Sequence, residues 1–102
     1  MNPLCNWFRV QGHVVGEKLK KLSQFHQVVA ITHLPQIAAY AQRHIAVRKM
    51  VLGQKTQTVS EVLEKETRVK ELARMLGGIN IHNDEPTQTS LKHAAELLSQ
   101  SQ

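Results

Sequence analysis

The sequence is poor in cysteine, aromatic residues and long apolar runs, and each shortage excludes a class of protein. Its one cysteine, Cys5, permits neither an intrachain disulfide nor a zinc site built from several thiolates, and it suits a reducing cytoplasm. Aromatic residues make up only 4% of the chain, so a core must be built from Val, Ile, Leu and Ala. No apolar run approaches the ~18 residues that a membrane span needs, and no signal peptide is recognisable at the N-terminus.

Motifs of complete catalytic sites are missing as well. The sequence contains no glycine-rich phosphate loop, no Asp-Glu pair at the end of a strand, no G-x-S-x-G turn and no H-E-x-x-H pair. The histidines also lack the two- to four-residue pairing of metal ligands, so we expect no metal site. They are His13, His26, His33, His44, His82 and His93.

Composition describes a small globular protein. The 102 residues fit one domain with a modest core, and 41% hydrophobic with 21% charged residues excludes a disordered chain. The net charge of +5 permits contact with nucleic acid, or equally a solvated surface or an acidic protein partner. The basic candidates are Lys18, Lys20 and Lys21 in one segment and Arg68, Lys70 and Arg74 in another; a solvated helix face is the default interpretation of both.

Apolar spacing predicts an α/β order of elements. Residues 14–22 have helical spacing, whereas residues 1–9 have no clear period. Residues 27–32 form a continuous β-branched run, typical of an inner strand buried on both faces. Pro35 then fits the first turn of a short helix.

The second half of the chain predicts a hairpin and two helices. Residues 45–52 and 56–63 alternate as two strands around a connection at residues 53–55. Residues 65–76 form the clearest helix, with a stop at Gly77 and Gly78. After a polar connection, a last helix is expected over residues 90–99, with Thr89 or Ser90 as N-cap.

His33 is the first candidate for chemistry, because it follows the end of the predicted strand at residues 27–32. Ligands of open α/β sheets bind at that edge, and an imidazole can hydrogen-bond a phosphate oxygen or a catalytic water. The alternative is a histidine that only caps the strand end. Thr32 and Gln36 share this ambiguity: either one orients His33 or a water, or it satisfies local backbone groups.

Three segments together carry a resemblance to a known family. Residues 14–19, residues 26–38 with Thr-His-Leu-Pro-Gln, and residues 68–78 with Glu-Leu-Ala-Arg-Met-Leu-Gly-Gly resemble, in this order and spacing, the C-terminal end of the RecN family. These bacterial DNA repair proteins are grouped with the ABC-type, SMC-like ATPases. The likeness covers residues 9–98; residues 1–8 lie outside the family pattern, and residues 99–102 are expected to be a frayed tail.

The resemblance implies a partial C-terminal lobe of an ABC-type ATPase head, built as helix-strand-helix, antiparallel hairpin and two C-terminal helices. His33 matches the switch histidine that contacts the terminal phosphate of ATP, with Thr32 and Gln36 as weaker binding candidates. In the full-length family, ATP and Mg²⁺ are used at a head–head interface in recombinational repair of DNA double-strand breaks. A bacterial, nucleoid-associated location in the cytoplasm follows from the same resemblance.

The family's phosphate loop, coiled coil, signature motif and acidic pair should lie upstream of Arg9, where this sequence has none of them. We therefore expect no ATP hydrolysis by this chain alone, because phosphoryl transfer needs those parts together. The expected partner is the missing N-terminal ATPase half or a second head, with DNA reached through the parent protein and no membrane. A truncated or separately encoded fragment is one interpretation; the alternative is a small basic nucleic-acid-binding or protein-interaction module without nucleotide chemistry.

Overall fold

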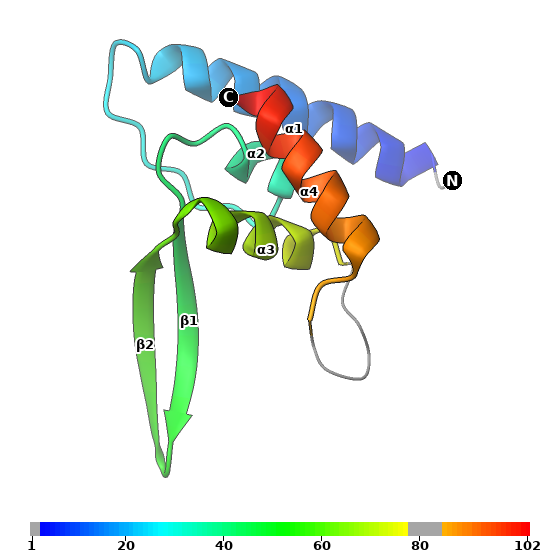
Figure 1. The fold of residues 1–102 in the computed structure, drawn as a ribbon. Coiled ribbons are helices and arrows are strands. Elements are labelled where there is room, and N and C mark those ends of the chain that lie inside the picture. The colour runs from blue at the N-terminus through cyan, green and yellow to red at the C-terminus, as the bar shows by residue number, and fades with distance from the viewer. Residues whose placement is uncertain (1–2, 78–84) are drawn as a thin grey trace.

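A computed structural model describes residues 3–77 and 85–102, and of residues 3–11 the backbone only. Its elements are α1 (Pro3–Leu22), α2 (Pro35–Ala38), β1 (Ile45–Leu52), β2 (Lys55–Val62), α3 (Lys65–Met75) and α4 (Gln88–Ser101). The helices gather on one side of the molecule, and the β1–β2 hairpin projects away from them (Figure 1). The predicted α/β class is confirmed, since helices combine with a two-stranded antiparallel sheet.

Helix α1 is longer than the sequence predicts. The apolar period begins only at Val14, yet the helix begins at Pro3 and includes Gly12 and Gly16. Both glycines are buried where α2 crosses α1, and an added Cβ at either would meet α2. Close packing between the two helices therefore offsets the low helix propensity of glycine, about 1 kcal/mol per residue.

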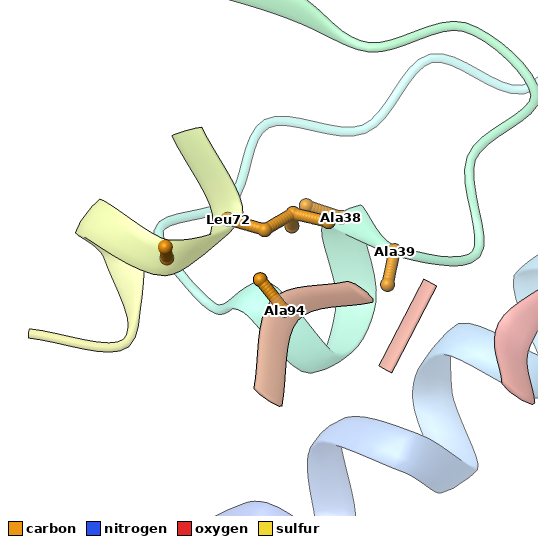
Figure 2. Packing of buried hydrophobic residues seen from close by; sticks show 5 residues of the cluster. Ala38, Ala39, Leu72 and Ala94 are labelled. Carbon is orange, nitrogen blue, oxygen red and sulfur yellow. The ribbon is translucent and has the colours of Figure 1, made fainter. Parts of the chain in front are cut away.

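The core is small and lies between α2, α3 and α4. Its buried members are Ala38, Ala39, Leu72, Ala73 and Ala94 (Figure 2). Partly buried leucines of α4 and Val69 of α3 pack around this cluster. The apolar stripes predicted for both C-terminal helices are thus confirmed, and alanines from α2 fill the space between them.

The ends of the last two helices follow local hydrogen-bonding chemistry. Gly77 adopts a φ of +84° after α3, as the predicted stop requires. The predicted N-cap of α4 is wrong: Thr87 is the cap, and its Oγ1 accepts from the N–H of Ser90 at 3.2 Å. Ser101 is 1% exposed at the other end, so the tail that was expected to be frayed is helical through this residue.

The predicted hairpin forms, but its return strand is Lys55–Val62 and not residues 56–63, so the connection is one residue shorter than expected. Register pairs Ile45 with Val62 and Leu52 with Lys55, which leaves a two-residue loop that begins at Gly53 with a φ of +65°. Glycine at the first loop position suits such tight connections. Of both strands only Ala46 is buried, so nearly the whole hairpin is exposed.

The inner strand predicted at residues 27–32 is not formed, and this expectation is wrong for the chain by itself. The segment is irregular, with Val29 84% and Ile31 101% exposed. A strand needs a neighbour for its backbone groups, and in the described residues the sheet consists of β1 and β2 alone. Residues 27–32 can be buried on both faces only if they join another sheet.

Candidate functional site around His33

His33 lies on the loop that enters α2. The hydroxyl Oγ1 of Thr32 accepts a hydrogen bond from the N–H of Leu34 at 3.0 Å, which folds the backbone back around His33. Leu34 is extended and Pro35 begins the helix, so the chain turns sharply at this point. The His33 side chain is exposed as a result. Thr32 therefore satisfies a local backbone group, one of the two roles that the sequence left open for it.

Gln36 lies against α1. A Cβ added at Gly12 would lie 3.0 Å from the Gln36 Cβ, which places this side chain directly over the glycine. Among the interactions of the described residues, no hydrogen bond joins Gln36 to Thr32 or His33. The structure thus brings Thr32 and His33 together on one loop and uses Gln36 for helix packing.

Tyr40 fixes the far end of α2 on α1. A Cβ added at Gly16 would lie 2.9 Å from Cε2 of Tyr40, closer still to its Cδ2, and 3.1 Å from the carbonyl oxygen of Gln36. The His13 ring meets the Tyr40 ring edge-on, with centroids 6.1 Å apart and Nδ1 3.4 Å from the hydroxyl. Sequence reasoning missed this contact, although the four-residue spacing of Gly12 and Gly16 was a signal of it.

The C-terminal end of α2 is held by a buried guanidinium. Nη2 of Arg68 donates to the carbonyl oxygens of Ala38 at 3.2 Å, Ala39 at 3.4 Å and Ala41 at 2.5 Å. The amide of Gln102 donates to Ala39 at 2.7 Å and to Ala41 at 3.1 Å. A cation at this position complements the negative end of the helix dipole. Burial lowers the pKa of Arg68, and the side chain acts here as a structural cap.

A second charged group links α3 to the hairpin. Arg74 donates to both carboxylate oxygens of Glu71, from Nε at 3.1 Å and Nη2 at 2.5 Å, and Arg48 of β1 lies 3.9 Å from the same carboxylate. Hydrogen bonding to Arg74 lowers the pKa of Glu71, and the neighbouring positive charges lower it further. Burial acts in the opposite direction but is outweighed. Burial, with the charge of Arg68, lowers the pKa of His44.

The basic residues singled out in the sequence divide into engaged and exposed ones. Arg68 caps α2, Arg74 pairs with Glu71, and Nζ of Lys20 donates to the carbonyl oxygens of Ser101 at 2.8 Å and Gln102 at 3.1 Å. Lys18, Lys21 and Lys70 are exposed. Three of these six basic residues therefore bond within the fold, and the other three are exposed to solvent.

The described residues contain neither a membrane-spanning helix nor a metal-binding cluster. None of the helices that the structure describes is long and apolar enough to cross a membrane. Within the same residues, His, Cys, Asp and Glu side chains nowhere gather in a group of three that could hold a metal ion.

Comparison with known proteins gives one consistent result. The chain is 48% identical to the DNA repair protein RecN of Treponema pallidum and 45% identical to that of Streptomyces coelicolor, each over 84 residues. It is 42% identical over 71 residues to the RecN protein of Xylella fastidiosa, which is 70% of this chain and 13% of that protein. No family model matches the chain.

The matched region covers most of this chain but little of its relatives. The 84 residues are 82% of the chain and 14% of the length of the Treponema and Streptomyces proteins. They correspond to the C-terminal part of those proteins. The expectation drawn from residues 9–98 is thereby confirmed at the level of the family, and the chain belongs with the C-terminal part of the RecN family of DNA repair proteins.

Proposed function

We propose that this chain is the C-terminal lobe of a RecN-type ATPase head and that it presents His33 to the terminal phosphate of ATP. The observation that carries the proposal is the exposed His33 on a turn closed by Thr32 and Leu34, within a chain similar to DNA repair proteins called RecN. The activity itself belongs to the longer protein, because the chain spans 14% of the length of these relatives.

The chemistry of the loop suits a phosphate group. Residues 27–41 contain no Asp or Glu, so no carboxylate of this segment repels an anion beside His33. An imidazole N–H donates to a phosphate oxygen or holds an attacking water in line. ATP with Mg²⁺, held by the phosphate loop of another chain segment, supplies the reacting phosphoryl group. This chain contributes one hydrogen-bond donor, His33, and holds it on a loop supported by the packing of α2 on α1.

The irregular segment before His33 supports the need for a partner. Val29 and Ile31 are almost fully exposed, although their sequence is typical of a strand buried on both faces. Each such side chain loses about 1.5–3 kcal/mol of stabilisation by remaining in water. We infer that the sheet in the remainder of the ATPase head pairs with residues 27–32 and buries both side chains. That pairing would also fix His33 at the strand end, where ligands of α/β sheets bind.

Reconstitution tests the proposal. The chain is mixed with RecN of Streptomyces coelicolor from which the matched C-terminal 84 residues are removed, and ATP hydrolysis is measured by phosphate release. We expect neither part to turn over ATP alone and the mixture to do so. His33→Ala should lower turnover at least ~100-fold, since positioned acid–base groups contribute about 10²–10⁴-fold.

His93→Ala is the matched control, because His93 is also an exposed histidine but belongs to α4 and not to the His33 loop. It should leave turnover unchanged. Hydrolysis by the unmixed chain that disappears in His33→Ala would overturn the assignment of the activity to the longer protein. Equal turnover for both histidine variants in the mixture would overturn the role of His33.

A further inference from the structure

Strand β2 has an outer edge whose backbone groups can be assigned. The N–H of Leu63 donates to the carbonyl of His44 at 2.9 Å, so these two residues form a hydrogen-bonded pair just beyond the strands. Hydrogen-bonded and non-hydrogen-bonded pairs alternate along an antiparallel ladder. The odd-numbered residues of β2 therefore bond to β1. The N–H and C=O groups of Thr56, Thr58, Ser60 and Val62 point outward, away from β1.

This outer edge is open. All residues of β2 are exposed, and the described part of the sheet contains no third strand. The strand has no proline, and its register with β1 contains no bulge, so it lacks two of the devices that protect edges from pairing. A two-stranded hairpin is also only marginally stable in water, whereas sheets of more strands are stable. A further strand would thus satisfy free backbone groups and strengthen the hairpin.

The sequence of β2 is complementary to itself in one antiparallel register. With a two-fold axis at Thr58, the outward groups of Thr56 meet those of Ser60 of the other copy, and Thr58 meets Thr58. In the same register Lys55 lies opposite Glu61, twice per pair of strands. Opposite charges and facing hydroxyls both stabilise cross-strand pairs.

Strand β1 has no such register. When two β1 strands pair antiparallel along their whole length, either Arg48 lies opposite Arg48 or Lys49 lies opposite Lys49. Like charges directly opposite each other are destabilising. Only one edge of the hairpin is therefore suited to a second copy. The four aliphatic side chains of one hairpin face would then line a wider apolar surface; they are Ile45, Val47, Val51 and Val62, each 52–72% exposed.

We propose that two copies of this chain pair through the β2 edges, antiparallel about Thr58, to form a four-stranded sheet. The partner is a second copy of the same chain, and the pairing is independent of the nucleotide chemistry assigned to His33. The hairpin projects away from the helices, which leaves the β2 edge accessible to a second copy (Figure 1).

Disulfide trapping tests the register. In a Cys5→Ser background, Thr58→Cys should form a dimer under mild oxidation, because hydrogen-bonded residues face each other with Cα atoms ~5.5 Å apart, a separation that a disulfide spans. Lys49→Cys is the control, since Lys49 is exposed on β1, whose outer edge is the opposite one. Equal rates of dimer formation by both variants would overturn the proposal.

Charge exchange tests the pairing without a crosslink. Sedimentation equilibrium should show a monomer–dimer equilibrium, and Glu61→Lys should raise the dissociation constant about tenfold because two favourable pairs become repulsive. The double variant Lys55→Glu with Glu61→Lys restores the pairs and should restore the constant. A native chain that stays monomeric throughout, or a double variant as weak as the single one, would refute the pairing. Far-UV circular dichroism verifies that each variant is folded.

Discussion

Replacing Gly16 by alanine sets two effects of opposite sign against each other. In an ordinary helix interior the change stabilises by about 1 kcal/mol, because alanine has the higher helix propensity. Here the new Cβ would lie 2.9 Å from Cε2 of Tyr40, closer to Cδ2, and 3.1 Å from the backbone oxygen of Gln36. The ring or the whole of α2 must therefore move.

The cost of overpacking should exceed the gain in helix propensity. Overpacking of this kind costs about 1–3 kcal/mol. After subtraction of the propensity gain, we expect the free energy of unfolding to fall by about 1 kcal/mol. Urea denaturation followed by circular dichroism measures this difference, and thermal unfolding should show a midpoint lower by about 4–8 °C. A variant more stable than the native chain would refute the reasoning, because propensity would then be the only effect.

Two further variants identify the cause. Gly12→Ala has the same propensity gain, but its tightest contact, with the Gln36 Cβ at 3.0 Å, is relieved by a shift of a few tenths of an ångström, so a change near zero is expected. In a Tyr40→Ala background the ring is gone, and the additional cost of Gly16→Ala should fall to nearly zero. Identical costs in the two backgrounds would show that Tyr40 is not the obstacle.

The remaining predictions concern a buried and an exposed arginine, the half-buried His44 and the buried Glu71. Arg68→Met should lower the free energy of unfolding by about 2–3 kcal/mol in urea denaturation, because hydrogen bonds to a charged group contribute about 1.5–3 kcal/mol. Arg74→Met should lower it by under ~1 kcal/mol, because the Arg74 side chain is 57% exposed. Equal losses for the two variants would contradict this difference. Stability should also fall on acidification in two stages. The folded pKa of His44 is lowered, so the unfolded chain binds its proton first and stability declines as the pH falls below about 6.5. The folded pKa of Glu71 is lowered too, so its contribution is present above the ordinary carboxyl pKa and is lost as the pH falls through the folded value. Denaturation of His44→Gln and Glu71→Gln across this range should show the first and the second stage flattened, and unchanged profiles would refute the assignment.

Local chemistry predicted the hairpin and α3 well. Alternating apolar residues around Gly53, and helical spacing that ends at Gly77, are signals that depend on neighbours within a few residues. The start of α4 was misjudged because Thr87, Thr89 and Ser90 are all good N-caps by type. Only the bond from the N–H of Ser90 to Thr87 shows which one is used.

Elements that depend on distant contacts were not predictable in the same way. Gly12 and Gly16 have low helix propensity, yet α1 continues through both, and their lack of a side chain allows the α2 segment to approach. In the candidate site, too, only local features were predictable from the sequence. The position of His33 after an apolar run was evident, but the packing role of Gln36 depends on how α1 and α2 cross.

By itself, the sequence determined the family, the α/β class, the presence of the hairpin and the position of His33 just before a short helix, since each is encoded in local spacing or in a specific order of residues. The tertiary structure alone decided which cations hold the fold: Arg68 and Lys20 bond to backbone carbonyls from distant parts of the chain. It alone also decided that residues 27–32 remain irregular. A strand is stabilised by its neighbours, and a sequence with strong strand propensity forms one only where another strand lies beside it.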